Sequence, residues 1–359
     1  MNKLIISTTL FLSQQNWTYR LKIHKEMKAI VYKKYGPPNV AELTDVVKPI
    51  PKENEVLVKV YTSTVNRTDA GLRSAQYFIS RFFTGLIRPK NQILGCEFAG
   101  CIEQVGDKVT LFKIGDRVFG FKDNGAGGHA EFLTIKETDA IGTIPKELSY
   151  LEAAPITEGA HYALNNIRAA LVKDGQNVLV NGATGAIGSA AVQLLKHYGA
   201  TVTAVCNSKN KELVKSLGAD FIIDYETSDF TETDKKFDFI FDAVGKSSFQ
   251  KCKPLLCKKG VYISTELGKY SANIFLALIT PIFKGKKVLF PLPVMNKEVI
   301  QLLSNLVEHG KFMPLIDRVY EMQQIVEAYT YVESKQKLGN VVLEIVENTN
   351  KKDLGLIAT

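Results

Sequence analysis

The sequence predicts an α/β protein with two domains, a glycine-rich β domain followed by a doubly wound parallel sheet. Three observations support this prediction. Residues 27–150 contain short segments of alternating apolar and polar residues, separated by Gly and Asp, as is typical of antiparallel strands. Residues 151–294 alternate strand-like and helix-like segments, which indicates a parallel sheet with helices on both faces. A glycine-rich turn joins the first strand of this second region to a helix.

The expected elements follow the chain in a simple order. In the first region we predict strands over EVLVKVYTSTVN, FAGCIEQVG and GDRVFGF. In the second region we predict strands over NVLVNGA, TVTAVC, DFIID, FDFIFDAVG and GVYISTEL, with helices IGSAAVQLLKHYG and NKELVKSLG between the first three. An amphipathic helix, KEVIQLLSNLVEHG, then ends at Gly310, and a last strand, GNVVLEIV, follows.

These elements set the expected domain boundaries. At 359 residues, of which 45% are hydrophobic, the chain has the length of about two domains. We expect 27–150 and 295–347 to form the first domain and 151–294 to form the second. Residues 1–26 read as an extension outside the fold, since their apolar run is interrupted by Ser and Thr and no cleavage site follows. Residues 348–359 read as a tail.

Charge and cysteine usage narrow the class of protein. Lys and Arg exceed Asp and Glu by 45 to 37. We interpret this excess as scattered over several lysine-rich stretches, so we expect no nucleic-acid partner. The apolar run 272–283 is too short for a bilayer and contains Pro281, so no transmembrane segment is expected. Five cysteines without disulfide-like clustering fit a cytoplasmic location.

The glycine-rich turn predicts a dinucleotide site. The strand NVLVN leads into Gly182, Ala183, Thr184, Gly185, Ala186, Ile187 and Gly188, and an apolar helix follows. This strand–turn–helix context is the one that the Rossmann fingerprint requires. We expect Gly185 to approach a pyrophosphate, Gly188 to let helix and strand pack closely, and the amides of the helix start to bind phosphate. The alternative is a glycine-rich turn in an unrelated α/β fold.

The end of the next strand predicts which dinucleotide binds. An acidic residue there would bind the ribose 2′-hydroxyl of NAD, but the sequence has Asn207, Ser208 and Lys209. These three groups can together hold a 2′-phosphate. NADPH is therefore the expected cofactor, and the alternative is a loop end that is merely solvated.

With these residues in hand, 27–346 resembles the medium-chain dehydrogenase/reductase superfamily, in its zinc-independent quinone oxidoreductase-like branch. The matching pieces are STVNRTDAGLRSAQY, ILGCEFAGCIEQVGDKVTLFKIGDRVFGF, GATGAIG, VKSLGADFIIDY and FDAVG. The resemblance implies a GroES-like catalytic domain and a Rossmann cofactor domain. It also implies an NADPH-dependent oxidoreductase.

The superfamily divides on a catalytic zinc held by Cys, His and Cys. The resemblance places Asn66, Cys96 and Pro155 at these three positions. Because a catalytic zinc needs three protein ligands, we expect no metal site.

Without a Lewis acid, hydrogen-bond donors must polarise the carbonyl of the substrate. The resemblance implies that Asn66 and Tyr77 face the nicotinamide and fill this role. The alternative for Asn66 is a turn residue that bonds its own backbone. The alternative for Tyr77 is a place in an apolar lid or packed helix.

Other cofactor contacts rest on the resemblance alone. It places Tyr225 at the adenosine end, Ala243 and Val244 beside the nicotinamide ribose, and Leu267 near the nicotinamide. Asn340 stands where relatives usually have a lysine, so one cofactor contact is expected to be lost.

The resulting hypothesis is hydride transfer from NADPH to a quinone or an α,β-unsaturated carbonyl, which is a small hydrophobic electrophile. A homodimer is expected by analogy. Two alternatives remain open: a zinc-dependent alcohol dehydrogenase, and an NADPH-binding protein with a structural or regulatory role.

Overall fold

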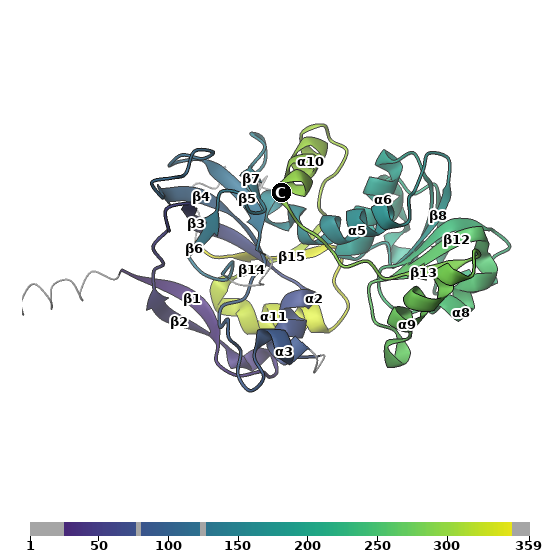
Figure 1. Cartoon of the computed structure of the whole chain (residues 1–359), viewed down its shortest axis with the longest axis horizontal. Helices are drawn as coiled ribbons and strands as arrows, with labels where there is room; N and C mark the ends of the chain where they lie inside the picture. Colours follow the sequence, from purple (N-terminus) through teal and green to yellow (C-terminus); the bar gives the residue numbers. More distant parts are fainter. Residues whose placement is uncertain (1–24, 77–79, 123–126, 347–359) are drawn as a thin grey trace, which may run out of the picture.

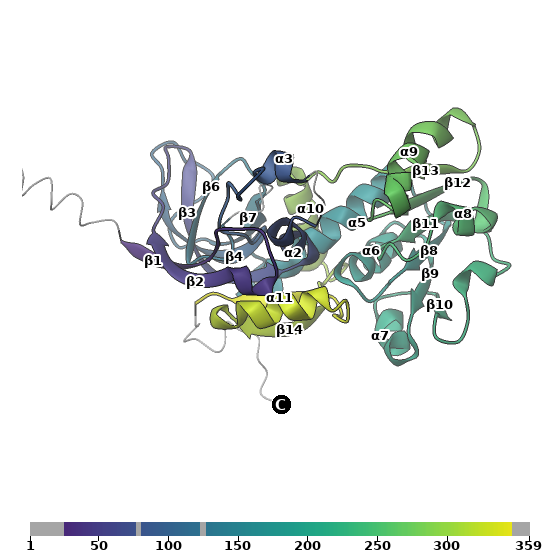
Figure 2. The same ribbon diagram turned by 90° about the horizontal axis from the view of Figure 1, so that it is seen from below.

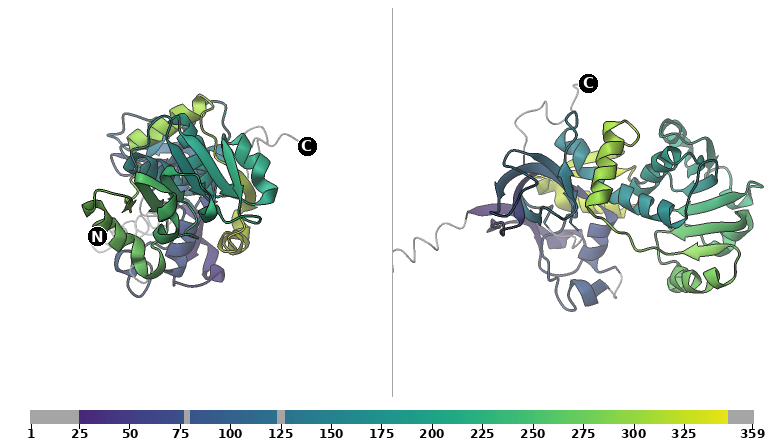
Figure 3. Two further views of the ribbon diagram at one scale, coloured as in Figure 1. Left: turned by 90° about the vertical axis from the view of Figure 1, so that its right-hand side faces the viewer. Right: turned by 45° about the horizontal axis from the view of Figure 1, so that its top comes forward.

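Two sheets, one mostly antiparallel and one parallel, divide the described residues into two halves (Figure 1). The computed structural model describes residues 25–76, 80–122 and 127–346. Figure 3 shows the two halves side by side, joined by helices and by the chain that returns from the second half to the first. The predicted fold class is confirmed.

The first half is built on a seven-stranded sheet with the order β14-β15-β3-β4-β5-β7, and β6 pairs with β3. A separate hairpin of β1 and β2 lies beside it. The C-terminal strand β15 pairs antiparallel with β3, so the end of the described chain returns to this half. Its elements are β1 (Glu26–Tyr32), β2 (Ala41–Val47), β3 (Glu55–Val65), α2 (Arg67–Ser74), α3 (Arg81–Thr84), β4 (Glu97–Val105), β5 (Arg117–Phe121), β6 (Phe132–Lys136), β7 (Ile141–Thr143), β14 (Ile316–Glu321), α11 (Ile325–Glu333) and β15 (Asn340–Glu344).

The second half is a six-stranded parallel sheet with the order β10-β9-β8-β11-β12-β13. The strand order reverses between β8 and β11, and ligands bind at such a switch point, outside the carboxyl ends of the strands. Its elements are α5 (Glu158–Ala169), β8 (Asn177–Asn181), α6 (Ala186–His197), β9 (Thr201–Cys206), α7 (Lys211–Ser216), β10 (Phe221–Asp224), β11 (Phe237–Asp242), α8 (Phe249–Cys252), β12 (Leu256–Ser264), α9 (Ala272–Ile279) and β13 (Lys287–Leu289).

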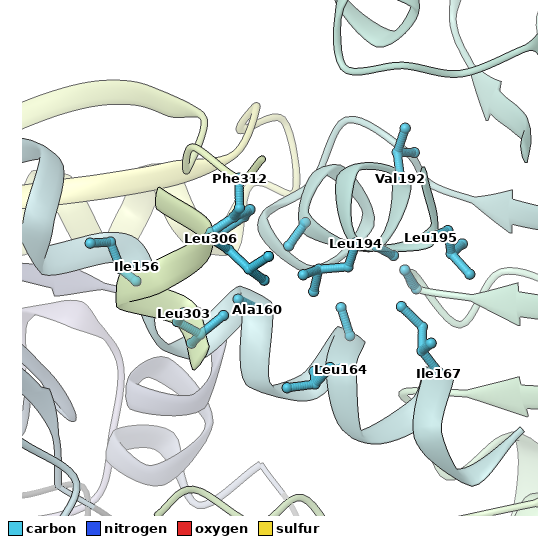
Figure 4. Close-up of a cluster of buried hydrophobic side chains, with 14 of the residues drawn as sticks. Ile156, Ala160, Leu164, Ile167, Val192, Leu194, Leu195, Leu303, Leu306 and Phe312 are labelled. Atoms are coloured by element: carbon cyan, nitrogen blue, oxygen red, sulfur yellow. The ribbon is translucent and has the colours of Figure 1, made fainter. Parts of the chain in front are cut away.

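A shared apolar core fixes the two halves together. Helices α5 and α6 pack against α10 (Lys297–Glu308), and their inward side chains form one cluster (Figure 4). Ala160, Leu164, Leu194, Leu303 and Leu306 in this cluster are at most 3% exposed. Burial of each such leucine stabilises the fold by about 2 kcal/mol. The two halves therefore share one packed apolar core.

The chain enters α5 through α4 (Tyr150–Ala153) and the 3-10 turn η3 (Ala154–Ile156). The N-cap Ser149 accepts from the Glu152 amide, and the Glu152 carboxylate accepts from the Ser149 amide, which forms a capping box. The turn η3 packs on β3 and β4. This path connects the interior of the first half directly to the start of α5.

Candidate active site

The glycine-rich turn after β8 is shaped by close packing. Gly182 has φ +82°, and a Cβ added there would lie 2.3 Å from Cγ1 of Val244. A Cβ on Gly188 would lie 2.1 Å from the Gly182 carbonyl oxygen. Both positions require glycine because the neighbouring atoms cannot move aside. Ala183 is fully buried beside them.

Gly185 differs from these two glycines. It is the N-cap of α6, with φ −75° and no side-chain cap, and the nearest atom to an added Cβ is 3.7 Å away. Thr184, Ala186 and Ile187 are likewise only half-buried. The first amides of a helix have no acceptor within the helix, so those of Ala186 and Ile187 suit an anion. The turn therefore fits a pyrophosphate group.

The end of β9 holds the residues expected to select the cofactor. Lys209 is exposed in the 3-10 turn Ser208–Asn210, and the side-chain Nδ2 of Asn210 donates to Oδ1 of Asn207 at 2.6 Å. The Ser208 hydroxyl donates to Asp224, and its backbone N–H donates to Glu226 at 3.1 Å. Two carboxylates from the neighbouring strand end thus engage Ser208, which the sequence of this loop alone did not indicate.

Lys211 offsets the charge of Asp224, and sequence reasoning missed this residue. Its ammonium group lies 3.0 Å from the Asp224 carboxylate. The hydrogen bond from Ser208, followed by those from Glu226 N–H and Lys211, lowers the pKa of Asp224. Lys209 and Lys211 therefore place two cations beside this strand end.

The remaining cofactor candidates lie at the same edge of the parallel sheet. Tyr225 follows β10, its backbone N–H donates to the Cys206 carbonyl at 3.1 Å, and its side chain is 55% exposed. Ala243 follows β11 and donates to the Asn181 carbonyl at 3.0 Å. Leu267 follows β12 and is half-buried. Since the carboxyl ends of parallel strands meet at one edge, these residues border one crevice together with the glycine-rich turn.

The first half reaches this crevice from the opposite side. The Gly339 amide donates to the Thr184 carbonyl at 2.7 Å. Arg67, the first residue of α2, pairs with Glu266 of the second half at 2.8 Å. The residue just before it, Asn66, therefore lies at the junction.

Asn66 is the N-cap of α2 and is 5% exposed. Its Oδ1 accepts from the Asp69 amide at 2.8 Å, which is the backbone-bonding alternative considered for this residue. Its Nδ2 donates to Cys96 Sγ at 3.0 Å. An amide nitrogen carries two hydrogens, so one remains for a substrate oxygen.

The three positions where the resemblance places the zinc ligands of other relatives carry an amide, a thiol and a proline. Burial raises the pKa of the Cys96 thiol well above its ordinary range. Asn66 directs an N–H at that sulfur, and Pro155 in η3 has no ligating side chain. The described part of the chain contains no group of three His, Cys, Asp or Glu side chains that could hold a metal ion.

A buried carboxylate organises the start of α5. Glu97 is fully buried and accepts hydrogen bonds from the Thr64 hydroxyl at 2.6 Å, from the Thr157 hydroxyl and amide at 2.8 and 3.1 Å, and from the Glu158 amide at 2.6 Å. Next to it, an added Cβ on Gly159 would lie 2.7 Å from the Ala186 carbonyl oxygen. The start of α5 is thus held against the glycine-rich turn.

Sequence reasoning also missed two residues whose charges interact, the buried Glu158 and the half-buried Lys337. Burial, followed by the charge of Glu97, raises the pKa of Glu158 well above its ordinary range. Burial lowers the pKa of Lys337, and the charge of Glu158 opposes that shift. Lys337 donates to the Gly339 carbonyl beside the turn. Asn340 donates to the Leu315 carbonyl at 2.9 Å instead, so Lys337 supplies the ammonium nearest the turn from this segment. It lies three positions before Asn340, where a lysine was expected.

Tyr77 lies outside the described residues. Within 25–76, 80–122 and 127–346, no helix is both long and apolar enough to cross a membrane.

Comparisons with known proteins agree with this architecture. Residues 52–146 match the family described as alcohol dehydrogenase GroES-like domain, and residues 217–343 match the family described as zinc-binding dehydrogenase. The second match does not include Asn66, Cys96 or Pro155. Its description therefore says nothing about those positions.

Individual relatives cover most of the chain. The 2-methylene-furan-3-one reductase of Solanum lycopersicum is 31% identical over 90% of this chain and 80% of its own length. The chloroplastic NADPH-dependent alkenal/one oxidoreductase of Arabidopsis thaliana is 31% identical over 91% of this chain and 82% of its own. The solved quinone oxidoreductase of Coxiella burnetii superposes with a TM-score of 0.81, at 27% identity over 90% of this chain and 100% of that chain. The chain therefore belongs to the medium-chain dehydrogenase/reductase superfamily, in its quinone oxidoreductase-like branch.

Proposed function

We propose that this protein is an NADPH-dependent, zinc-independent reductase of quinones or α,β-unsaturated carbonyls. The observation that carries the proposal is the pairing of two features across one crevice. One is a glycine turn in which a Cβ on Gly185 would come no closer than 3.7 Å to another atom. The other is Asn66, a buried amide donor hydrogen-bonded to the protonated Cys96 thiol. A dinucleotide site thus faces a neutral hydrogen-bond donor.

The relatives support this class of substrate. Those with 31% identity are named as reductases of a methylene-furanone and of alkenals and alkenones. A solved neighbour is named as a quinone oxidoreductase. In all of these substrates, negative charge develops on a carbonyl oxygen as hydride arrives, so a donor aimed at that oxygen accelerates the reaction.

The residues of the crevice fit NADPH. The turn 182–188 would hold the pyrophosphate, Tyr225 would contact the adenosine end, and Ala243, Val244 and Leu267 would border the nicotinamide ribose and ring. Lys209 with Asn207 would hold the 2′-phosphate, and Lys211 would reduce the repulsion from Asp224. When bound, the reduced nicotinamide supplies the hydride.

The protein's own groups then orient the acceptor and stabilise its charge. The free N–H of Asn66 donates to the carbonyl oxygen, while the capping bond from Asp69 N–H to Oδ1 fixes the amide plane. Glu97 holds the start of α5 in place through three hydrogen bonds and is bonded to Thr64 of β3 by a fourth. The proton that completes the reaction comes from Tyr77 or from solvent.

Zinc independence is part of the proposal. It is supported by Pro155, which cannot be a ligand, and by Asn66, whose amide donates toward the only sulfur at these three positions. The homodimer and the cytoplasmic location stay predictions.

A turnover assay tests the proposal. Purified protein is mixed with NADPH or NADH and with a small quinone, an acyclic enone or a simple aldehyde, with and without a metal chelator. We expect oxidation of NADPH by quinone or enone that the chelator does not change. Turnover limited to aldehydes or alcohols and abolished by chelator would support a zinc-dependent alcohol dehydrogenase. Tight NADPH binding without turnover of any acceptor would support a structural or regulatory role.

A further inference from the structure

The loop 334–339, between α11 and β15, joins the first half of the molecule to the glycine-rich turn. The Gly339 amide donates to the Thr184 carbonyl at 2.7 Å, and Gly339 forms a parallel bridge with Gly185. Figure 2 shows this C-terminal segment, in yellow, on the side of the first half that borders the second. A side chain held at Gly339 therefore lies next to the space expected for a pyrophosphate.

The backbone of this loop is anchored to its own half. The Leu338 amide donates to Oδ2 of Asp317 at 2.9 Å, and the same oxygen accepts from the Tyr331 hydroxyl at 2.7 Å. Gly339 has φ +65°, and a Cβ added there would lie 2.2 Å from the Leu315 carbonyl oxygen. The position of the loop relative to the turn is thus fixed by β14 and α11.

Lys337 brings an ammonium group with free donors to this place. The side chain is half-buried, and its Nζ donates to the Gly339 carbonyl. Within residues 25–76, 80–122 and 127–346, no carboxylate forms an ion pair with it. An ammonium carries three hydrogens, so two N–H groups are left for a ligand.

The charges around Lys337 leave room for an anion. Burial lowers the pKa of Lys337, and the positive charge of Arg67 lowers it further, while Glu158 opposes both effects. Burial in turn raises the pKa of Glu158 well above its ordinary range, which favours the neutral acid. Arg67 is already paired with Glu266 at 2.8 Å. A phosphate beside Lys337 would supply the missing negative charge and raise its pKa again.

The opposite side of the same space offers only neutral donors. The first amides of α6 lack acceptors within the helix and suit a phosphate, but Gly185, Ala186 and Ile187 bring no charged side chain. Asn340, which follows the loop, is also uncharged, and its Nδ2 donates to the Leu315 carbonyl at 2.9 Å. Lys337 is therefore the cation that this segment can offer to a pyrophosphate.

We propose that Lys337 of the first half binds the pyrophosphate of the dinucleotide and completes the site that the backbone amides of the turn begin. The inference rests on the proposed NADPH-dependent function. It assigns to the first half a charged contact with the cofactor that does not involve the 2′-phosphate. Cofactor binding would then link the two halves through one ion pair.

Fluorescence titration of the full chain with NADPH and NADH, without an acceptor, tests the proposal. Lys337→Met should raise the dissociation constant about tenfold or more, since a hydrogen bond to a charged partner is lost. The factor should be the same for both cofactors, because both carry the pyrophosphate. Lys337→Arg keeps a cation and should raise the dissociation constant by less.

Two controls separate this contact from general effects. Lys335→Met removes the same charge from an exposed position of the same loop and should leave both dissociation constants unchanged. Adenosine 2′-monophosphate carries the 2′-phosphate but no pyrophosphate, so its affinity should be the same for the wild type and Lys337→Met. Retained binding of this fragment also shows that the variant is folded.

Four outcomes would overturn the proposal. One is unchanged binding of both cofactors by Lys337→Met. A second is a loss confined to NADPH, which would place Lys337 at the 2′-phosphate instead. A third is an equal loss for the cofactors and for adenosine 2′-monophosphate, which would indicate a structural role. The fourth is a wild-type chain that binds neither cofactor, and this result alone would overturn the proposed function as well.

Discussion

The two sides of the crevice are built differently. On the side of the second half, the glycine-rich turn uses backbone atoms and residues that are adjacent in sequence, within 182–188. On the side of the first half, Asn66 contacts Cys96 and Glu97 contacts Thr157, over separations of 30 and 60 residues. The charges of Glu158 and Lys337, which are 179 residues apart, also interact. A local motif reveals the glycine-rich turn of the second half, while only the tertiary structure reveals the contacts on the side of the first half.

On the side of the first half, the largest loss of stability is expected when the buried carboxylate of Glu97 is removed. Glu97→Ala leaves the amides of Thr157 and Glu158 and two hydroxyls without their acceptor. Each unsatisfied buried donor costs about 1–3 kcal/mol, so we expect the free energy of unfolding to fall by about 4 kcal/mol in denaturant titrations. Glu97→Gln keeps one acceptor oxygen, so its free energy of unfolding should fall by less. An equal fall in both variants would contradict the role of Glu97 as a hydrogen-bond acceptor.

Two glycines of the turn, Gly188 and Gly185, are expected to respond differently to substitution by alanine. Gly188→Ala places a Cβ against the Gly182 carbonyl, and we expect it to lower the free energy of unfolding by about 3 kcal/mol. Gly185→Ala places its Cβ in open space and should leave folding unchanged while weakening NADPH binding more than about tenfold, because the methyl group enters the space for the pyrophosphate. Thermal melting and fluorescence titration of NADPH separate the two effects. Intact NADPH binding by Gly185→Ala would show that the pyrophosphate lies elsewhere.

The buried His161 makes the fold sensitive to acid. Burial lowers the pKa of His161 from 6.5 to about 4. Its neutral form therefore contributes stability that is complete above pH 6.5 and is lost as the pH falls toward 4, by up to about 3 kcal/mol. His161→Phe keeps the ring contacts with Phe121 and Tyr162 and should lose less stability over this range. If the free energy of unfolding fell equally with pH in the wild type and the variant, His161 would make no such contribution.

The smallest expected effect concerns cofactor choice. Lys209→Ala should raise the KM for NADPH about tenfold and leave that for NADH unchanged, because only NADPH carries the 2′-phosphate. Lys215→Ala, an exposed lysine in α7, is the matched control. If Lys209→Ala changed both cofactors alike, the phosphate would not lie at this strand end.

The difference between the two sides explains what could be predicted from the sequence. Strand alternation and the glycine turn predicted the fold class and the crevice, because both signals are local. Asp224 near Ser208 could not be found, because the contact depends on the register of β9 and β10. Lys337 was missed because its place near the glycine-rich turn depends on the return of the chain to the first half. Tyr77 and the assigned cofactor contacts stay predictions.

The central claim is that an amide donor replaces the metal, and the kinetics of Asn66→Ser test it most directly. Serine keeps the N-cap of α2 but removes the amide that is hydrogen-bonded to Cys96. We predict a fall in kcat of about 100-fold with a quinone or enone, with an unchanged NADPH dissociation constant and melting temperature. An unchanged kcat, or stoichiometric zinc in the active wild-type protein, would contradict the claim.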